Sequence, residues 1–427
     1  MKTKTIQSIK GFKDILPSEV KYYKYIEKIV SDIAEQYAIN ELRLPLLERS
    51  ELFLKSIGDS TDIVNKEMYD FIDKNGESIC LRPEGTASIV RAVIEHNLVY
   101  DRGLKKQRYM YYGPMFRHEK PQKGRYRQFN QFGIEYFGFK DTNSDLEIII
   151  LGNHIFNMMK LNNTELYINS LGNEFDKDKY SNIITDYFSS IKDILDDHQL
   201  KTLSNNPLRL LDSKKDNITN LLDDIPKMID TLSIDSKNRF QILLNKLDDI
   251  GIKYHVDNSI VRGLDYYNDT VFEWRDKTLG SQNAICAGGR YDSLVENTGG
   301  DDVPAIGFAI GVERIVELLK TNNIKYEAKK PIIPFMSTIS ESESYGIELV
   351  TALRNKYPKI SFLTTDTSAS LSSQTKNALK INDSIILLVT DDNLKDKSVT
   401  VKMKENKMND KILTKNELIE LMDKIYE

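Results

Sequence analysis

Cysteine is scarce in this chain, which has only Cys80 and Cys286 among its 427 residues. Two cysteines are too few for a disulfide framework, so a small disulfide-stabilised secreted domain is excluded. The five histidines show no metal-ligand spacing among themselves or with the cysteines. This argues against a structural zinc site. We therefore expect no metal held by the protein's own side chains.

Long apolar segments are also missing. No run approaches the roughly 18 residues that a membrane-spanning helix needs, and residues 1–10 lack the apolar core of a secretory signal. Together with the few cysteines, this predicts a cytoplasmic protein. The net charge is −5, with 59 basic and 64 acidic residues. Any nucleic acid would therefore have to bind to local basic patches.

The order of patterned segments predicts a large mixed domain. Apolar residues at helical spacing follow Pro17, and residues 79–138 resemble mostly antiparallel strands. A long apolar helix is expected at about 143–160. Residues 172–250 are rich in Asp, Lys, Asn and Leu and almost devoid of glycine, so we expect a helical insertion there. Strand-like sequence resumes from 259 to 310 and ends in a helix.

A second, smaller domain is expected after a polar linker at residues 321–330. Strand-like and helix-like segments mix after Pro331, which favours an α/β domain of about 100 residues. The expected strands are 332–335, 360–363, 384–389 and 399–403, and the expected helices are 345–356, 371–379 and 415–425.

The segment from Arg117 to Arg127 is unusual because it carries five lysines and arginines in eleven residues, broken by Pro121 and Gly124. Tyr109–Tyr112 before it and Phe129–Phe137 after it have strand character, so the basic segment would join two strands of a hairpin. Arginines in such a connection can bind phosphate oxygens in a bidentate way. The alternative is a solvated charged loop without function.

Three further segments accompany the basic one. They are Leu81-Arg82-Pro83-Glu84-Gly85-Thr86, then Val261-Arg262-Gly263-Leu264-Asp265-Tyr266-Tyr267, and finally Ala287–Asp292 with Ile306–Arg314. As a set, in this order, they resemble class II aminoacyl-tRNA synthetases, and specifically the histidyl-tRNA synthetase family. The basic segment resembles class II motif 2, and Gly311-Val312-Glu313-Arg314 resembles motif 3. Pro45, Glu48 and Leu52-Phe53 resemble motif 1, the dimer-forming element.

The resemblance implies an α+β fold: a class II antiparallel sheet flanked by helices, a helical insertion, and a C-terminal α/β anticodon-binding domain. The expected catalytic domain is 1–325, with the insertion at about 172–250, and the anticodon-binding domain is 326–427. It further implies a homodimer that uses ATP and Mg²⁺ to join L-histidine to tRNA(His).

The first reaction step fits the arginines of these motifs. The carboxylate of free histidine is ionised at neutral pH and attacks the α-phosphorus of ATP, so the need is for positioning and for cations around the developing charge. The resemblance implies that Arg117 bridges the carboxylate and the α-phosphate, and that Arg262 acts opposite it as the second catalytic arginine. Arg125 and Arg314 would hold the outer phosphates, and Glu119 would contact the adenine side. For Arg262 the alternative is a salt bridge with Asp265.

Specificity for histidine requires polar partners for both ring nitrogens, because a buried partner left unpaired costs about 1–3 kcal/mol. The resemblance implies a set of residues around the amino acid. Glu135 and Tyr267 would face the ring, Tyr266 would line the pocket, and the α-amino group would contact Glu84, Thr86 and Gln131. Arg117 and Arg262 complete the set of histidine-binding residues. Packing of the tyrosines in an aromatic core remains an alternative. Gly288, Gly289, Gly307 and Gly311 would allow the backbone to approach substrate or ATP closely; the alternative for Gly289 and Gly307 is that they only relieve strain in turns or strands.

The resemblance also suggests how tRNA would be bound. Gln122 and Arg127 are candidates for contacting the acceptor stem, and residues 208–214 resemble a motif of the family's insertion, unless they only cap and pack a helix. The chain departs from the family at residues 368–376, which are poor in cations where relatives carry a basic helix. Phosphate contacts there should be few, so anticodon binding is expected to be weak.

Three alternatives to this function were weighed. One is a non-catalytic, histidine-sensing paralogue, the regulatory subunit of ATP phosphoribosyltransferase, which usually lacks the C-terminal domain. Another is a class II synthetase for threonine, proline or glycine, which the segment 262–267 argues against. The third is an RNA-binding protein without catalysis, which would show no amino-acid-dependent ATP chemistry.

Overall fold

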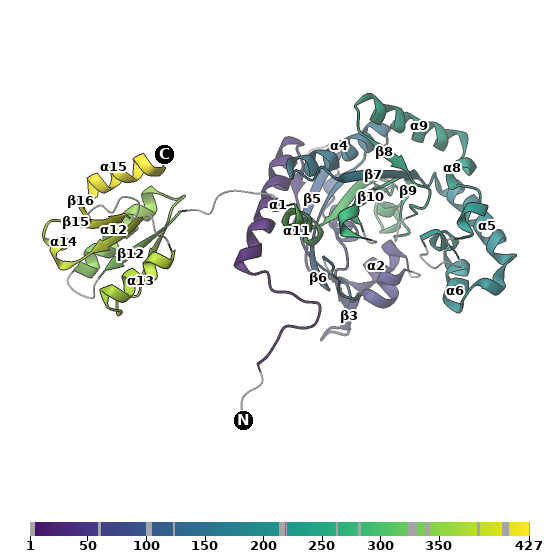
Figure 1. Cartoon of the computed structure of the whole chain (residues 1–427). Coiled ribbons are helices and arrows are strands. Elements are labelled where there is room, and N and C mark those ends of the chain that lie inside the picture. The colour runs from purple at the N-terminus through teal and green to yellow at the C-terminus, as the bar shows by residue number, and fades with distance from the viewer. Residues whose placement is uncertain are drawn as a thin grey trace. The chain divides into compact units, whose positions relative to one another are not determined.

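The computed structural model divides the chain into two compact units, Met1–Ile324 and Lys325–Glu427 (Figure 1). It describes residues 5–58, 61–99, 105–122, 124–212, 218, 220–261, 264–280, 283–322, 331–337, 342–381, 385–403 and 410–426. Each unit is described by itself below.

A sheet of eight strands forms the centre of the first unit. Its strands, in spatial order, are β1 (Asn40–Glu41), β5 (Gln107–Phe116), β6 (Gln128–Phe137), β11 (Ala305–Gly311), β10 (Ala284–Arg290), β9 (Asn268–Asp276), β7 (Thr164–Ser170) and β8 (Tyr254–Val256). Neighbours run antiparallel except at the two edges, where β1 pairs with β5 and β8 pairs with β7 in parallel. This is the antiparallel sheet that the sequence predicts.

The hairpin of β5 and β6 is long and regular. Its ten residue pairs run from Gln107 opposite Phe137 to Phe116 opposite Gln128. Both expected strands are present, and residues 117–127 join them as predicted. Side chains alternate along each strand, so Ile134 and Tyr136 face one side of the sheet while Gln131 and Glu135 face the other.

Four helices cover the first side of the sheet and build the larger apolar core with it. They are α1 (Pro17–Gln36), α4 (Thr142–Met158), α9 (Ile234–Asp249) and α11 (Val312–Thr321). Helix α1 begins with Pro17, whose fixed φ suits a first turn, and buries Ile26, Val30 and Ile33 at helical spacing. The expected helices after Pro17 and near 143–160 are therefore confirmed.

A second apolar core lies on the opposite side of the sheet. It combines α3 (Thr86–Glu95) with α10 (Leu294–Asn297), the segment that contains Tyr266 and Tyr267, and much of the region between β7 and β8. The regular secondary structure of that region is helical within the described part of residues 174–249. Before α9 it consists of α5 (Glu174–Ser189), α6 (Asp197–Asn205), α8 (Met228–Thr231) and the short 3-10 turns η3 (Lys192–Ile194), η4 (Pro207–Asp212) and η5 (Leu222–Asp224).

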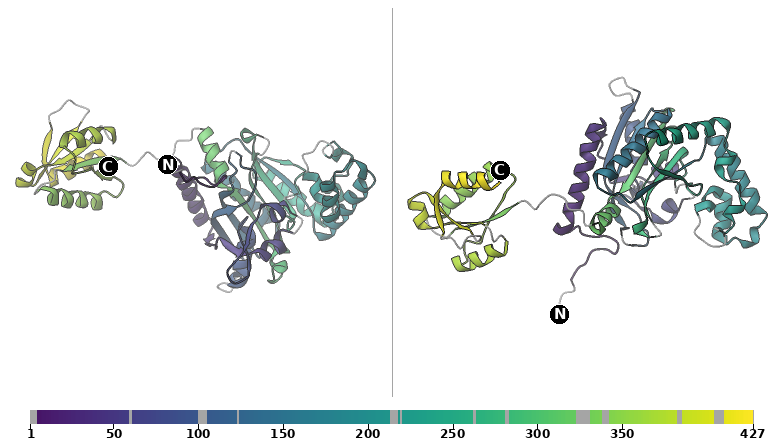
Figure 2. Two further views of the ribbon diagram at one scale, coloured as in Figure 1. Left: turned by 90° about the horizontal axis from the view of Figure 1, so that it is seen from below. Right: turned by 45° about the horizontal axis from the view of Figure 1, so that its top comes forward.

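Helices α5, α6 and α8 gather at one side of the first unit in every view (Figures 1 and 2). Their connection to α9 depends on Asp176, a buried carboxylate in the first turn of α5. It accepts hydrogen bonds from the Ser233 nitrogen at 2.7 Å and from the Ser236 hydroxyl at 2.6 Å. Because Ser233 precedes α9, one carboxylate joins the beginnings of two helices of the region.

A small antiparallel sheet completes the first unit, in the order β2 (Leu47–Arg49), β4 (Ser78–Leu81), β3 (Tyr69–Ile72). Helix α2 (Ser50–Ile57) packs on it with Phe53 fully buried. A short π-helix, η1 (Ile63–Glu67), and a 3-10 turn, η6 (Lys277–Leu279), fill two connections.

The second unit has five strands in the order β13 (Ser361–Thr364), β12 (Ile332–Ser337), β14 (Ile385–Val389), β15 (Ser398–Met403), β16 (Lys411–Thr414). Its helices are α12 (Ser342–Lys356), α13 (Leu371–Ile381), α14 (Asp391–Lys395) and α15 (Lys415–Tyr426). Every segment expected here is present within the described residues. The sequence missed α14 and β16 because a one-turn helix and an exposed four-residue edge strand have no clear apolar periodicity.

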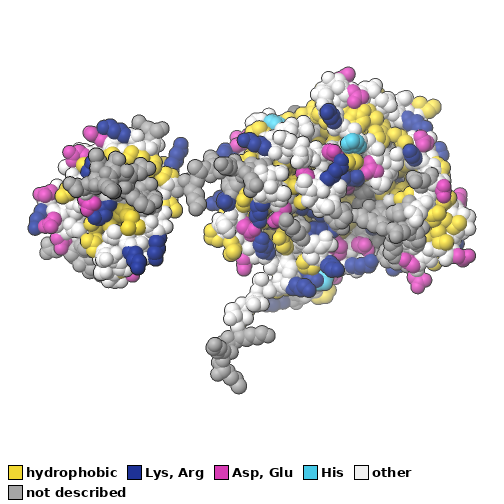
Figure 3. Space-filling model, in the orientation of Figure 1, with side chains coloured by type: hydrophobic (Ala, Val, Ile, Leu, Met, Phe, Trp, Pro, Cys, Tyr) yellow, Lys and Arg dark blue, Asp and Glu magenta, His cyan; other side chains and the backbone are white. Residues whose placement is uncertain are grey.

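Charges of both signs are interspersed over the face of each unit shown in Figure 3. This agrees with the small net charge of −5. Among the described residues, no helix combines the length and apolarity required to cross a membrane.

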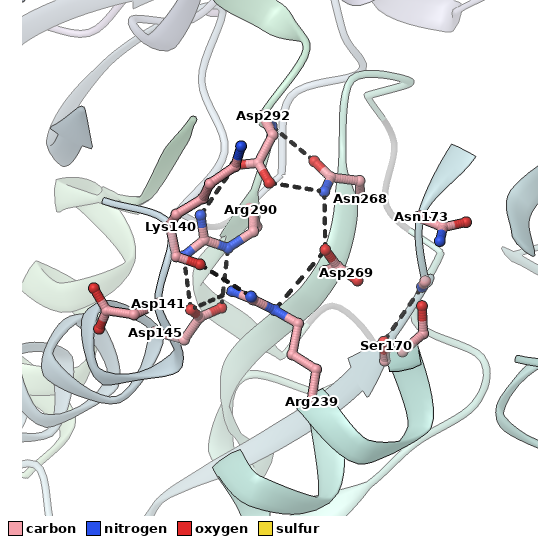
Figure 4. A network of polar contacts seen from close by, with 12 residues as sticks. Lys140, Asp141, Asp145, Ser170, Asn173, Arg239, Asn268, Asp269, Arg290 and Asp292 are labelled. Carbon is pink, nitrogen blue, oxygen red and sulfur yellow. Dashed lines mark hydrogen bonds and ion pairs between the residues drawn. The ribbon is translucent and has the colours of Figure 1, made fainter. Parts of the chain in front are cut away.

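A buried polar network joins α4, α9, β9 and β10 (Figure 4). Arg290 of β10 and Asp145 of α4 are both fully buried and lie 2.7 Å apart, and Arg239 of α9 contacts the same carboxylate at 3.0 Å. Arg290 also donates to the Phe139 carbonyl, and Asp292 provides a second acidic partner at 3.0 Å. Arg290, which belongs to the Gly-Gly-Arg-Tyr-Asp segment, therefore has a structural role.

We predict that Asp145→Ala lowers the free energy of unfolding of the first unit by about 3 kcal/mol, because it leaves the buried Arg290 charge with Asp292 alone. The urea midpoint measures this change. Asp32→Ala is the matched control, since Asp32 forms an exposed ion pair with Lys28 at 2.8 Å and should change little. Equal shifts in the two variants would contradict a structural role for the network.

Candidate active site

A cavity of about 570 Å³ opens in the first unit, lined by residues of β6, β9, β10 and β11, the start of α3 and the segments 117–125 and 259–267. It brings together nine of the residues predicted from sequence. These are Glu84, Thr86, Arg117, Glu119, Arg125, Gln131, Tyr266, Tyr267 and Arg314. Segments far apart in the chain thus meet at one place.

The basic segment between β5 and β6 is folded back on the protein. The Arg117 nitrogen donates to the Arg127 carbonyl at 2.9 Å, and the Arg127 nitrogen donates to the Gly11 carbonyl at 2.9 Å. Gln122 and Arg125 form a further two-way backbone bridge at 3.0 Å. These contacts give the described part of the segment a fixed course along the cavity, so the alternative of a solvated loop is not supported.

Arginine side chains from segments far apart in the sequence converge on the cavity. Arg117 is oriented by a hydrogen bond from Nε to the Pro83 carbonyl at 2.8 Å and by the Phe129 ring, 5.4 Å from its guanidinium carbon. Arg125 pairs with Glu119 at 3.2 Å. Arg314, in the first turn of α11, donates to the Ala284 carbonyl.

Arg314 is electrostatically strained. Burial, together with the positive charges of Arg125 and Arg117, lowers the pKa of Arg314 to about 10, although the carboxylates of Glu119 and Glu273 act in the opposite direction. A guanidinium with that pKa is still charged at pH 7. An anion bound between these arginines would offset both their repulsion and their loss of solvation.

A buried carboxylate, Glu84, also lines the cavity. The Glu84 side chain accepts hydrogen bonds from the backbone nitrogens of Thr86 at 2.6 Å and Ala87 at 2.7 Å, at the start of α3. Burial raises the pKa of Glu84, and these two hydrogen bonds oppose the increase. Helix α3 thus fixes the carboxylate with its first free N–H groups.

Glu135 is held directly behind the cavity lining. It is 1% exposed, and it accepts the Thr86 hydroxyl at 2.8 Å and the Tyr291 hydroxyl at 2.5 Å. Burial raises the pKa of Glu135 to about 8, although the bonds from Tyr291 and Thr86 act in the opposite direction. Thr86, which does line the cavity, therefore connects Glu135 to its interior.

Tyr291 is a residue that the sequence interpretation did not assign to the site. It lies within Gly-Gly-Arg-Tyr-Asp, so the motif was noted, but nothing in the sequence says that its hydroxyl meets Glu135. Its ring packs with those of Tyr266 and Tyr267, whose centroids lie 5.5 Å and 6.3 Å away. The ring centroids of Tyr266 and Tyr267 are 4.6 Å apart. Both tyrosines therefore pack in an aromatic cluster and also line the cavity.

Two polar atoms in the cavity wall are buried without a hydrogen-bond partner among the described residues, the Gln131 Oε1 and the Tyr266 hydroxyl. An unsatisfied buried polar atom costs about 1–3 kcal/mol. Such atoms are expected to have their partners in a bound molecule.

The glycines near the cavity have two different functions. A Cβ on Gly307 would lie 1.6 Å from Glu135 Oε2, so this glycine makes room for the protein's own carboxylate. At Gly311 a Cβ would meet nothing closer than 4.0 Å, and this residue lines the cavity. Only the second position leaves its space to a ligand.

Two further predicted residues, Gln122 and Arg127, are not among the described residues that line the cavity. Gln122 is exposed, and Arg127 donates to the carbonyls of Glu119 at 3.3 Å and Lys10 at 3.5 Å. Arg262 is outside the described residues, so its predicted role and its alternative salt bridge are both untested. Asp265 itself contacts Arg209 at 3.0 Å.

Two structural anchors were not assigned from sequence. Arg82 is buried and donates to the carbonyls of Pro114 at 3.0 Å and Leu44 at 3.1 Å. Glu313 accepts the Asn130 nitrogen at 2.9 Å, which fixes the start of α11 to β6. Arg82 and Glu313 both belong to the motif segments given above. Their hydrogen bonds hold the backbone of neighbouring segments in place.

The cavity can therefore hold a molecule with a polyanionic part and a small polar part. Arginines line it together with carboxylates and the Gln131 amide, and Arg125 pairs there with Glu119. Among the described residues, no cluster of three or more His, Cys, Asp or Glu side chains could hold a metal ion.

Comparison with known proteins identifies the family. The family model described as histidyl-tRNA synthetase matches residues 11–315. The chain is 44% identical to the histidine–tRNA ligase of Buchnera aphidicola subsp. Schizaphis graminum, with 99% of this chain and 98% of that protein covered. It is 40% identical to the histidine–tRNA ligase of Hydrogenovibrio crunogenus, with 98% of each covered.

Solved structures agree with the fold. The apo histidyl-tRNA synthetase of S. aureus matches with a TM-score of 0.81 at 29% identity, covering 98% of this chain and 99% of that one. The expected class II architecture is thereby confirmed. A Bacillus halodurans protein described as an ATP phosphoribosyltransferase regulatory subunit/histidyl-tRNA synthetase matches at 21% identity, a TM-score of 0.61 and coverage of 88% and 97%, which shows a shared fold alone.

The relatives that match this chain at 40% and 44% identity over nearly its full length are histidine–tRNA ligases, so the histidine-sensing paralogue is not favoured. The motifs, the cavity they form and the full-length relatives lead to one conclusion: the chain belongs to the histidyl-tRNA synthetase family.

Proposed function

We propose that this protein activates L-histidine with ATP to histidyl-adenylate and then transfers histidine to the 3′ end of tRNA(His). The observation that supports this most strongly is that one cavity is lined by Arg117, Arg125 and Arg314 together with Glu84 and Gln131. An amino acid and a nucleoside triphosphate have the complementary charges.

In the first step, a carboxylate oxygen of histidine attacks the α-phosphorus, and the bond from that phosphorus to the leaving pyrophosphate breaks. Arg117 would contact both reacting groups, while Arg125 and Arg314 would hold the outer phosphates. Because these arginines are fixed by the protein before the reaction, they can stabilise charge without reorganising. Arg262 retains its proposed place opposite Arg117, on the strength of the resemblance alone.

Recognition of histidine is proposed for the part of the cavity near Glu84. Glu84, Thr86 and Gln131 would bind the α-amino group, and Tyr266 and Tyr267 would surround the ring. Glu135, which lies behind the lining, would face the ring through Thr86. A pKa of about 8 for Glu135 lets the carboxyl hold or release a proton near neutral pH. It could therefore complement a neutral or a charged imidazole.

Magnesium is proposed to arrive with ATP. The acidic residues of the cavity are engaged with protein partners, as Glu119 with Arg125 and Glu313 with Asn130 show. Mg²⁺ commonly keeps several waters and binds substrate phosphates with few protein ligands. The residues present thus fit a nucleotide-bound ion, which would help to neutralise the phosphates, and they do not fit a resident metal site.

We further propose that tRNA contacts both units and that Gln122 and Arg127 contact the acceptor stem. Residues 368–376 remain poor in cations, but α13 and β15 present Lys376, Lys380 and Lys402 along one groove. Lys376 is the single cation of residues 368–376 and Lys402 forms an ion pair with Asp410, so anticodon binding through this surface is proposed to be weak. Residues 326–427 would form the anticodon-binding domain, and the two buried free cysteines fit a cytoplasmic location.

A histidine charging assay tests the function. With ATP and tRNA(His), the protein should attach labelled histidine to the tRNA, and omission of any one component should abolish the product. A protein that binds histidine but leaves the tRNA uncharged would contradict the proposal and favour the sensing paralogue.

Replacing Arg314 should separate ATP from histidine. We expect Arg314→Gln to raise the KM for ATP about tenfold or more, since a charge-assisted hydrogen bond contributes about 1.5–3 kcal/mol, and to leave the KM for histidine within about twofold. Arg43→Gln is the control because the Arg43 side chain is 86% exposed. Equal increases in the two KM values would contradict a phosphate-binding role.

Glu135 makes stability depend on pH. Its pKa is about 8 in the folded chain against 4.5 ordinarily, so between these values the folded state binds more protons, and stability falls as pH rises. Glu135→Gln removes this effect. The difference in free energy of unfolding between the variant and the natural chain should grow by about 1.4 kcal/mol per pH unit from pH 5 to 8. If the free energies of unfolding of the two chains instead changed with pH in the same way, Glu135 would be ionised in the folded chain over the whole range.

A homodimer is proposed through the small sheet and α2. Large apolar side chains are exposed there on neighbouring elements: Leu46 42%, Leu47 46%, Leu54 45%, Phe71 47% and Ile72 66%. A second copy of the chain would cover them, in keeping with the resemblance of this region to motif 1.

Sedimentation tests the dimer. The natural chain should sediment as a dimer at micromolar concentration, and Ile72→Asp should shift it to the monomer. Ile412→Asp, on an edge strand of the second unit where Ile412 is 67% exposed, should leave the dimer intact. A monomeric natural chain would overturn the proposal.

A further inference from the structure

One carboxylate connects the helical insertion to the residues of the amino-acid pocket. Asp265 precedes Tyr266 and Tyr267 directly, and its Oδ1 accepts hydrogen bonds from Asn206 Nδ2 at 2.7 Å and from Arg209 Nε and Nη2 at 3.1 Å and 3.0 Å. Asn206 follows α6, and Arg209 lies in η4. Both donors therefore come from the insertion, more than fifty positions away in sequence.

Asp265 is also fixed from the side of α2. Its backbone nitrogen donates to the Ile57 carbonyl at 3.3 Å. Gly58, which ends α2 with φ of +96°, leaves room for the carboxylate, because a Cβ there would lie 2.4 Å from Asp265 Oδ2. The insertion, the end of α2 and the segment that leads into Tyr266 thus meet at Asp265.

The surroundings are suited to transmit a displacement. Leu208, Leu210 and Leu211 flank Arg209 and are at most 9% exposed, in the same apolar core as Tyr266 and Tyr267. Close-packed side chains and a half-buried ion pair, with side chains 17% and 27% exposed, resist gradual deformation. A shift of the insertion would therefore move the loop that carries the two tyrosines.

We infer that Asn206, Arg209 and Asp265 form a positioning cluster that couples the insertion to the histidine pocket. Arg209 does not line the cavity, so it acts through Asp265 on the placement of Tyr266 and Tyr267. Coupling between two sites is reciprocal. Binding of histidine thus favours one placement of the insertion, and a ligand on the insertion, such as a tRNA acceptor stem, changes the affinity for histidine.

The inference rests on the proposed function, and histidine-dependent ATP–pyrophosphate exchange with the full-length protein tests it. Arg209→Gln should raise the KM for histidine about tenfold, within the usual range of coupling between sites, and leave the KM for ATP within about twofold. Asp265→Asn should do the same. The double variant should be no worse than the poorer single variant, because both remove one interaction.

Lys201→Gln is the matched control, since Lys201 is an exposed cation on α6 of the same insertion. If Arg209→Gln does not fold, Asn206→Ala removes one donor and should raise the KM for histidine by a smaller factor. Thermal unfolding of each variant should remain a single transition close to that of the natural chain.

Three outcomes would overturn the inference: an unchanged KM for histidine in Arg209→Gln, equal increases for histidine and ATP, or additive effects in the double variant. Absence of histidine-dependent exchange in the natural chain would instead refute the proposed function. That result would be seen before any variant is compared.

Discussion

The alternation of side chains along β6 fixes the core and the cavity together. Ile134 and Tyr136 face the helices that cover one side of the sheet, while Gln131 and Glu135 face the cavity side. A shift of one residue would exchange the two sets. The register opposite β11 prevents this, because Glu135 lies across from Gly307, where any Cβ would collide with its carboxylate. The position of the pocket therefore follows from strand pairing.

Electrostatics then determine what the cavity can accept. Burial and neighbouring arginines lower the pKa of Arg314, while burial raises the pKa of Glu84 and Glu135. The charged forms of Arg314 and of the two carboxyl groups are thus both disfavoured by their surroundings. A ligand with phosphates at one end and a cationic amino group at the other favours both charged forms at once. This is why we assign ATP to the arginines and histidine to the carboxylates.

Much of this architecture could be predicted from sequence, because local patterns specify it. The strands around the basic segment, the helix after Pro17 and the apolar helix near 143–160 follow from periodicity. The motifs indicated which residues gather around the cavity. Long-range partners could not be predicted: nothing local shows that Tyr291 donates to Glu135, that Arg290 is a buried structural cation, or that Arg209 reaches Asp265. Such contacts depend on how distant segments pack.

The central claim is that one cavity selects histidine and activates it with ATP. ATP–pyrophosphate exchange measured with each of the twenty amino acids in turn tests this most directly. The account predicts exchange with histidine and with no other amino acid. Exchange with a different amino acid would contradict the assignment of histidine to the carboxylates of the cavity, and no exchange with any of them would contradict the enzymatic function itself.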